Sequence, residues 1–253
     1  MKLSLKKEQE LSKLKTKFLT LVSHEFMTPL SGILTSAGLI EKYNEKATNE
    51  KIAKHSTIIK SRAIQINNML DDFISLEKTE SENYPLRLSK FKLCDVINRL
   101  LHDSKAILKE GQRIEITPCK APIEVWQDRK ALEIIINNVL YNAIKYSPEH
   151  SLIKIKFHRN DLLKISIEDN GIGIPKEAQK YVFDKFYRGK NALTIQGTGI
   201  GLNTVKRYLE KLNGSIKIHS KENKGTKVLI ELPIDYDKLK AQVLKYESIE
   251  PNH

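Results

Sequence analysis

The sequence predicts an α + α/β protein, in which an N-terminal helical hairpin is followed by an α/β sandwich domain. Three observations support this fold class. Apolar residues recur at heptad spacing through residues 1–82, paired strand-like segments appear only after them, and a polar stretch that contains Pro85 separates the two patterns. We therefore place the domain boundary near residue 83, with domains over 1–82 and 83–235 and a tail of unassigned role over 236–253.

Two long helices are expected in the first domain, over residues 1–41 and about 51–79. Apolar residues recur in them at intervals of three, four or seven: Leu11, Leu14, Phe18, Leu21, Ile52, Ile59, Ile66 and Phe73. Joined by a polar linker, the two helices make a hairpin with one broad apolar face. A second copy of the chain is the natural cover for that face, so the sequence predicts a homodimer with a four-helix bundle.

The second domain mixes helices and strands. Helices are expected over about 93–110, 128–146 and 200–213, and strands over 113–118, 123–126, 152–159, 162–169, 214–220 and 225–233. The turn-forming pair Asn160 and Asp161 joins the two longest central strands. Because strands and helices do not alternate strictly, we expect an α/β sandwich.

Composition excludes several classes of protein. The chain has 253 residues, of which 40% are hydrophobic and 29% charged, as in soluble globular proteins. It contains neither a long apolar run nor an apolar secretory h-region, so we expect no membrane span and no secretory signal in it. Cys94 and Cys119 have neither metal-site spacing nor a disulfide framework, which favours the cytoplasm, and we expect both to be packing residues.

The formal charge of +12 raises the question of nucleic-acid binding. The excess lies in residues 83–235, which hold 27 lysine and arginine residues against 17 acidic residues. These cations are scattered, without a dense basic run or interleaved aromatic residues, so we expect a solvated surface and no nucleic-acid partner.

Four polar residues share one side of the helix expected over 128–146. Asn138, Asn142, Lys145 and Tyr146 stand at positions i, i+4, i+7 and i+8. Asparagine oxygens suit Mg²⁺ when phosphates supply the negative charge, and a nearby lysine can contact those phosphates. Taken alone, this pattern fits a helix with solvated amides equally well.

Two glycine-rich segments flank regular elements, "EDNGIGIP" after a strand and "GTGIGL" before a helix. Gly171 and Gly173 allow the backbone to approach a flat ring, and Asp169 can accept a hydrogen bond from an exocyclic amine. The glycines of the second segment allow backbone N–H groups at a helix N-terminus to face an anion. Neither segment fits the dinucleotide fingerprint or the P-loop, so each alone could be only a tight turn.

In this order, the motifs resemble the transmitter portion of a sensor histidine kinase of a two-component system. "SHEFMTPL" resembles the phosphoacceptor box, "NNVLYNAIKYS" the N box, "DNGIGIP" the first glycine box, "FDKFYRG" the phenylalanine box and "GTGIGL" the second glycine box. The resemblance spans about residues 10–235. It implies a dimerisation and phosphoacceptor hairpin over 1–82, and over 83–235 the ATP-binding sandwich shared with gyrase-type ATPases and a heat-shock chaperone.

The resemblance also implies ATP and Mg²⁺ as cofactors. It assigns the metal to Asn138 and Asn142. It also implies that Phe183 and Phe186 anchor the start of a lid, "YRGKNALTIQGTG", which is suited to becoming ordered only around bound nucleotide. The other nucleotide-binding residues that it implies are Lys145, Tyr146, Asp169, Gly171, Gly173, Arg188, Gly197, Thr198, Gly199, Gly201 and Leu202.

The phosphoacceptor box explains why a His-Glu pair precedes a proline. A neutral imidazole is a competent nucleophile, so His24 can attack the γ-phosphorus of ATP while Glu25 holds the ring tautomer and takes up the proton. Pro29 lacks an N–H, and we expect it to bend the helix beside His24. By the resemblance, Thr28 positions water for removing phosphate from the aspartate of a response-regulator receiver domain.

Met27 is a departure from the family, which usually has arginine there, and Phe26 replaces the usual leucine. Met27 motivates one alternative, a phosphatase-dominant or catalytically silent dimeric scaffold. The other alternative is a gyrase-like or chaperone-like ATPase, although the activity of such an ATPase would not require the motif "SHEFMTPL". Because no sensor domain or membrane segment precedes the hairpin, we expect either a piece of a longer protein, such as the cytoplasmic portion of a membrane sensor, or control by another chain.

Overall fold

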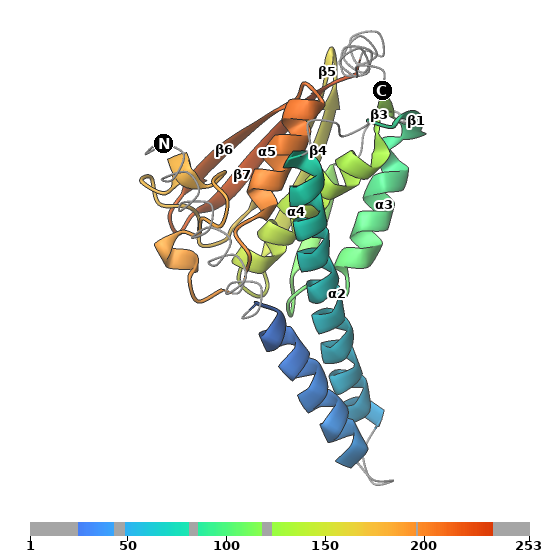
Figure 1. The fold of residues 1–253 in the computed structure, drawn as a ribbon, viewed down its shortest axis with the longest axis vertical. Coiled ribbons are helices and arrows are strands. Elements are labelled where there is room, and N and C mark those ends of the chain that lie inside the picture. Colours follow the sequence, from blue (N-terminus) through green and yellow to red (C-terminus); the bar gives the residue numbers. More distant parts are fainter. Residues whose placement is uncertain (1–24, 43–48, 81–85, 118–122, 196, 235–253) are drawn as a thin grey trace, which may run out of the picture. The chain divides into compact units, whose positions relative to one another are not determined.

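The computed structural model describes residues 25–42, 49–80, 86–117, 123–195 and 197–234. The chain divides into two compact units, one of residues 1–73 together with 196–198 and the other of residues 74–195 together with 199–253, so the first division falls within helix α2. The first unit is helical and the second is an α/β sandwich (Figure 1), so the predicted fold class is confirmed. The domain boundary near residue 83 stays a prediction. None of the helices in the described ranges is long and apolar enough to span a membrane.

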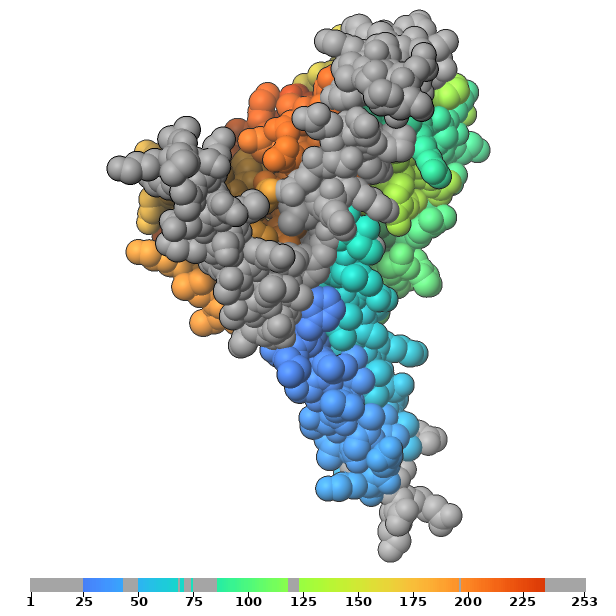
Figure 2. Space-filling view, in the orientation of Figure 1, coloured from blue at the N-terminus to red at the C-terminus, as the bar shows by residue number. Residues whose placement is uncertain are grey.

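The first unit is a helical hairpin, as predicted. Residues 25–42 form one helix, which continues through Pro29, and α2 (Asn49–Glu80) forms the other. The two helices pack side by side (Figures 1 and 2). At Gly32 the helices are close, since a Cβ atom there would be in ordinary van der Waals contact with the side chain of Arg62, 3.4 Å from its Nε atom. Residues 1–24, which include His24, lie outside the described residues.

One side of the helix over 25–42 is apolar and exposed. Met27, Leu30 and Leu34 follow the spacing of a single helical side, and they are 65%, 45% and 66% exposed. Ile52 and Leu70 of α2 are exposed large hydrophobic residues as well. A single hairpin therefore leaves much of its apolar surface uncovered.

The second unit contains three α-helices, seven strands and two short 3₁₀-helices among the described residues. The helices are α3 (Leu93–Ser104), α4 (Arg129–Tyr146), α5 (Gly201–Lys211), η1 (Gln179–Tyr181) and η2 (Lys190–Ala192). The strands are β1 (Leu88–Lys92), β2 (Arg113–Thr117), β3 (Glu124–Asp128), β4 (Leu152–Arg159), β5 (Leu162–Asp169), β6 (Ser215–Lys221) and β7 (Gly225–Pro233).

Five strands form the main sheet in the order β2-β4-β5-β7-β6. The β2 and β4 pair is parallel, and the other pairs are antiparallel. Helices α3, α4 and α5 cover one face of this sheet (Figure 1), and their apolar residues form one core with it. Leu163, Ile165 and Ile167 of the central strand β5 alternate into that core, with 0–1% of each exposed. A separate antiparallel pair joins β1 to β3.

Helix α4 lies at the centre of the helical layer. Its buried residues recur in pairs at helical spacing: Ala131, Leu132, Ile135, Ile136, Val139, Leu140, Ala143 and Ile144. Asp128 caps its N-terminus, because Oδ1 accepts a hydrogen bond from the N–H of Ala131 at 2.9 Å. The other oxygen of Asp128 accepts from the N–H of Arg87 at 2.9 Å, so the same side chain holds the chain at the start of β1.

The C-terminus of α4 is capped from another part of the chain. The Nζ atom of Lys109 donates to the carbonyl of Lys145 at 2.8 Å. The Nε2 atom of the buried Gln112 donates to the carbonyls of Ile144 at 3.1 Å and Pro148 at 2.9 Å. These contacts satisfy carbonyls that a helix end leaves without partners, and they place a cation at the negative end of the helix. Burial lowers the pKa of Lys109.

Most predicted elements are present within a few residues, and the strands over 152–159 and 162–169 are confirmed. The predicted helix over 93–110 is wrong after Ser104, because the segment that follows turns to cap α4. Strand β1 was missed, since its residues were taken for a polar linker. The packing role predicted for Cys94 is wrong, because this residue is exposed.

We expect Gln112→Ala to lower the free energy of unfolding by about 1–3 kcal/mol, because buried carbonyls at the end of α4 lose their donor. Urea unfolding of the full chain measures this change. Glu110→Ala is the matched control, since Glu110 is exposed in the same turn. Equal stability of the two variants would contradict the capping role.

Candidate functional site

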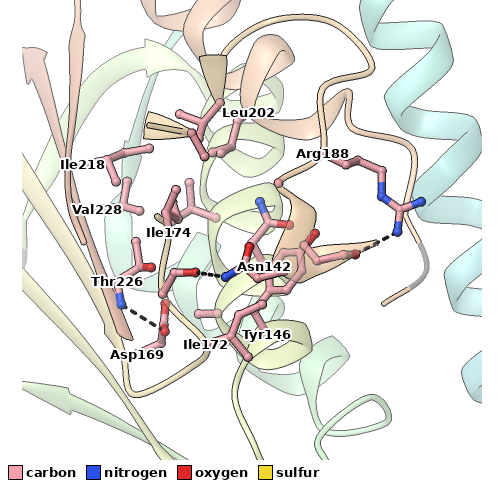
Figure 3. Close-up of a pocket in the computed structure, with 18 of the residues that line it drawn as sticks. Asn142, Tyr146, Asp169, Ile172, Ile174, Arg188, Leu202, Ile218, Thr226 and Val228 are labelled. Atoms are coloured by element: carbon pink, nitrogen blue, oxygen red, sulfur yellow. Dashed lines mark hydrogen bonds between the residues drawn. The ribbon is translucent and has the colours of Figure 1, made fainter. Parts of the chain in front are cut away.

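A pocket of about 820 Å³, including the part open to solvent, lies in the second unit. Figure 3 shows Asp169 and Thr226 on one side of it and Arg188 on the other. Most of the wall is apolar, and its large aliphatic residues are Val139, Ile167, Ile172, Ile174, Val182, Leu202, Ile218 and Val228. A pocket with mostly apolar walls and a few polar groups is typical of a small-molecule site.

Asp169 is the buried carboxylate of the pocket. It ends β5 and is only 8% exposed. Its Oδ1 atom accepts hydrogen bonds from the N–H groups of Gly171 at 2.8 Å and Thr226 at 3.2 Å. Burial raises the pKa of Asp169 to about 6, although these two hydrogen bonds lower it. With Oδ1 occupied, Oδ2 is the atom that can accept a hydrogen bond from a ligand amine.

The glycine loop after β5 requires its glycines. A Cβ atom on Gly171 would lie 2.5 Å from the carbonyl oxygen of Tyr146. Gly173 has a φ of +64°, and a Cβ atom there would collide with the carbonyl of Lys221. The N–H of Ile172 donates to the carbonyl of Tyr146 at 3.1 Å. The loop is therefore held between the end of α4 and the turn between β6 and β7.

The polar side of α4 only partly faces the pocket. Asn142 and Tyr146 line it (Figure 3), but Asn138 and Lys145 are not among its lining residues. The Nδ2 atom of Asn138 donates to the carbonyl of Ile134 at 3.0 Å. The Nζ atom of Lys145 lies 4.4 Å from the centre of the Tyr146 ring.

The second glycine segment leads into α5. Gly199 has a φ of +70°, and its carbonyl accepts a hydrogen bond from the N–H of Phe186 at 2.9 Å. A Cβ atom on Gly201 would collide with the Oδ1 atom of Asn138, so this glycine brings the start of α5 against α4. Leu202 lines the pocket. Gly197 and Thr198 are not among the lining residues, and Thr198 is buried.

Arg188 lines the pocket, but its guanidinium group is bound by the backbone that follows it. The Nη2 atom donates to the carbonyls of Ala192 at 2.9 Å, Leu193 at 3.0 Å and Ile195 at 2.5 Å. To approach phosphates as predicted, the guanidinium group of Arg188 would therefore have to leave these backbone carbonyls.

The phenylalanine box is tied to α5 through backbone groups. The Nδ2 atom of Asn203 donates to the carbonyl of Phe183 at 2.8 Å, and the ring of Phe183 lies 5.7 Å from the Nζ atom of Lys206. Neither Phe183 nor Phe186 lines the pocket. These contacts agree with the predicted role of anchoring the segment that starts at Tyr187.

The predicted catalytic residues belong to the hairpin. Glu25 is 4% exposed, and Thr28 is exposed. His24 lies outside the described residues. Glu25 and Thr28 belong to the first unit, whereas the residues that line the pocket belong to the second.

Sequence reasoning missed residues that form or shape the pocket. Thr226 lines it, and Gly225 precedes Thr226 at the start of β7, where the sequence predicted only a strand. A Cβ atom on Gly225 would collide with the carbonyl of Asp169, and this crowding has no sequence signal beyond the glycine itself. Asn191 also lines the pocket, from a segment that was predicted only as a lid.

The described residues contain no group of three or more His, Cys, Asp or Glu side chains that could hold a metal ion. A metal at this site would therefore depend on neutral oxygen ligands, such as the amide of Asn142, together with oxygens of a bound anion. The chemistry of the pocket suits a flat heteroaromatic ring with an amine directed at Asp169, joined to an anionic group that binds a metal.

Comparison with known families agrees with this arrangement. Residues 127–236 match the family described as histidine kinase-, DNA gyrase B- and HSP90-like ATPase. Residues 14–82 match the His Kinase A (phospho-acceptor) domain. Together the two matches cover most of the chain.

Individual histidine kinases are similar to the chain in sequence and in fold. The chain is 30% identical to the sensor histidine kinase WalK of Bacillus subtilis, over 89% of this chain and 38% of WalK. The structure of the mycobacterial sensor histidine kinase MprB is 27% identical, with a TM-score of 0.51 over 58% of this chain and 97% of the other. The structure of the histidine kinase ThkA in complex with the response regulator protein TrrA shares the fold, with 18% identity and a TM-score of 0.58 over 91% of this chain and 65% of the other. The chain spans less than half of the length of the curated relatives that it matches.

We expect Asp169→Asn to stabilise the protein at neutral pH. A carboxyl whose pKa is raised in the folded state contributes stability that is present below its unfolded pKa and is lost as the pH rises through the folded value. With a shift from 3.8 to about 6, the neutral amide should gain about 3 kcal/mol at pH 7.5 and about half of that at pH 5. Urea unfolding at both pH values measures this gain, and a variant that is less stable at pH 7.5 would contradict it.

Proposed function

The chain belongs to the sensor histidine kinases of two-component systems, as their transmitter portion, and we propose that it phosphorylates its own His24 with ATP and then passes the phosphoryl group to an aspartate of a response-regulator receiver domain. The observation that carries this proposal is the pocket around Asp169 in the same chain as a match to the phosphoacceptor domain. The family match over residues 127–236 indicates ATP binding, and the pocket has a buried carboxylate, Asp169, that can accept a hydrogen bond from the adenine amine.

Asp169 would read the adenine ring. Its Oδ2 atom would accept a hydrogen bond from the exocyclic amine, and the glycine loop would let the backbone pass close to the ring. The apolar walls exclude water from both faces of the base, which strengthens this single polar contact. Tyr146 would lie near the ribose, and the start of α5, with Gly199 and Gly201, would lie near the phosphates.

Asn142 and Asn138 would hold Mg²⁺ together with phosphate oxygens. The ion supplies charge neutralisation of the transferring phosphoryl group when it is bound. Amide oxygens suit this ion because they are hard and neutral, and Asn142 already lines the pocket. Lys145 would add a positive charge near the phosphates after leaving the ring of Tyr146.

In the transfer step, an imidazole nitrogen of His24 would attack the γ-phosphorus. An N–P bond forms, the bond from the γ-phosphorus to the bridging oxygen breaks, and ADP leaves with the electron pair. Glu25 would hold the imidazole tautomer and take up its proton, and its burial at 4% exposure supports an orienting role. The aspartate of the receiver domain then takes the phosphoryl group from the histidine.

A homodimer completes the proposal, with domains over 1–82 and 83–235. The exposed apolar side formed by Met27, Leu30 and Leu34 supports it, because a second hairpin would cover that side as a four-helix bundle. The match to the phosphoacceptor domain ends at residue 82, in agreement with the proposed boundary. Such a transmitter would work in the cytoplasm, where ATP and receiver domains are available.

The response-regulator partner is proposed from the chemistry and from one neighbour, since the fold of ThkA was solved with a response regulator. Thr28 is exposed on the helix that carries the phosphoacceptor box, so it would be accessible to a docked receiver domain. It would position the water that removes phosphate from the receiver aspartate. A phosphatase-dominant or silent scaffold is the second candidate, and Met27 in place of a cation favours it.

We expect His24→Gln to abolish self-phosphorylation while leaving ATP affinity within a few-fold, because the nucleophile and the nucleotide pocket belong to different domains. Incubation with γ-labelled ATP and Mg²⁺, followed by acid and base treatment, tests for acid-labile phosphohistidine. Label that stays on the variant would refute the assignment of His24, and an unlabelled original chain would favour the scaffold.

Met27→Arg should raise the rate of self-phosphorylation by no more than about tenfold. Met27 is 65% exposed, and an exposed cation on a helix is typically worth under about 1 kcal/mol, whereas about 1.4 kcal/mol corresponds to a factor of ten. The two proteins are compared with labelled ATP at saturating Mg²⁺. If only the arginine variant forms phosphohistidine, the scaffold or phosphatase function replaces the kinase.

A further inference from the structure

The segment Tyr187–Ile195, here called the lid segment, forms one wall of the pocket through Asn191 and its neighbours. We propose that Asn191 is a positioning residue that latches the lid segment onto the glycine loop and thereby sets the rate of nucleotide release. The proposal rests on the proposed function, since it takes the pocket as the nucleotide site. Its central observation is a hydrogen bond of 3.0 Å from the Nδ2 atom of Asn191 to the carbonyl of Gly173.

The carbonyl of Gly173 is a fixed point on the glycine loop. On one side of it, the carbonyl of Ile172 accepts a hydrogen bond from the N–H of Asn223 at 2.7 Å. On the other side, the N–H of Ile174 donates to the Oγ atom of Ser220 at 2.8 Å. The peptide groups on both sides of Gly173 are therefore hydrogen-bonded to the hairpin of β6 and β7. A side-chain amide that donates to the carbonyl of Gly173 is thereby attached to the main sheet.

The lid segment is folded by contacts of its own. Arg188 donates to three carbonyls between Ala192 and Ile195, and the N–H of Ala192 donates to the carbonyl of Gly189 at 2.9 Å. These contacts fold the chain on either side of Asn191, which lies within η2. The lid segment can therefore move as one piece when the hydrogen bond to Gly173 breaks, without first unfolding.

The position of the latch links it to the ligand. Asn191 and Gly173 both line the pocket, together with the base-reading Asp169. A ring bound against the glycine loop would lie beside the latch, so release of the ligand requires the lid segment to separate from this loop. The Asn191 contact adds to the barrier for that separation, but it does not touch the groups that transfer phosphate.

The test measures release of nucleotide from the full chain. The protein is loaded with a fluorescent N-methylanthraniloyl ATP analogue and Mg²⁺, then chased with unlabelled ATP in a stopped-flow instrument. We expect Asn191→Ala to release the analogue about three- to tenfold faster, as the loss of one hydrogen bond predicts. Asn191→Asp keeps the shape of the side chain but replaces the donor by an acceptor, so it should release at least as fast as the alanine variant.

Leu193→Ala is the matched control, because Leu193 belongs to the lid segment and is 60% exposed. It should release the analogue within twofold of the unchanged protein. A latch also predicts that the Asn191 variants bind the analogue at least as fast as the unchanged protein. A purely structural role would instead slow binding.

Two results would overturn the proposal in distinguishable ways. Release at the unchanged rate from Asn191→Ala or Asn191→Asp would refute the latch and leave the kinase function intact. Failure of the unchanged protein to bind the analogue would refute both the latch and the nucleotide site.

Discussion

The site depends on one constraint, which is the burial of a carboxylate at the end of the central strand. Asp169 loses most of its hydration there, and the two backbone N–H groups that reach its Oδ1 atom offset only part of that cost. Both donors are backbone groups, so the loop after β5 and the first residue pair of β7 must converge on one oxygen. That convergence is possible only where the chain lacks Cβ atoms, at Gly171 and Gly225.

Helix α4 links the position of the glycine loop to the rest of the second unit. The carbonyl of Tyr146, in its last turn, accepts the N–H of Ile172, so the position of the glycine loop follows the end of the helix. That end is capped by Gln112, from a segment far away in the sequence, and the other end by Asp128, which directly precedes the helix. The residues that position the site therefore lie well outside the pocket.

The sequence predicted those parts of the fold that follow from local pattern. Alternating apolar residues over 162–169 and helical spacing over 129–146 were sufficient, because burial of one face selects a single register. The break after Ser104 and the pairing of β1 were not predictable, because they follow from contacts with distant partners. The glycine motifs and Asp169 were predictable by resemblance, and the structure brings Asp169, Gly173, Asn142 and Tyr146 to one pocket. Thr226 and Asn191 contribute through a backbone N–H and one amide, which leave no periodic signal in a sequence.

The two ends of the pocket differ in how far they are preorganised. At the base end, Asp169 is held by two hydrogen bonds and the glycine loop is fixed between a helix end and a hairpin. On the opposite side of the pocket, Arg188 is engaged with the protein itself, because it binds backbone carbonyls. Lys145, which does not line the pocket, lies over the ring of Tyr146. A phosphate that recruits either cation must replace those contacts, so part of its attraction is offset. In the proposed function, fixed recognition of the base would combine with adjustable contacts to the phosphates, as an enzyme needs when its substrate must lose the γ-phosphoryl group and its product must then leave.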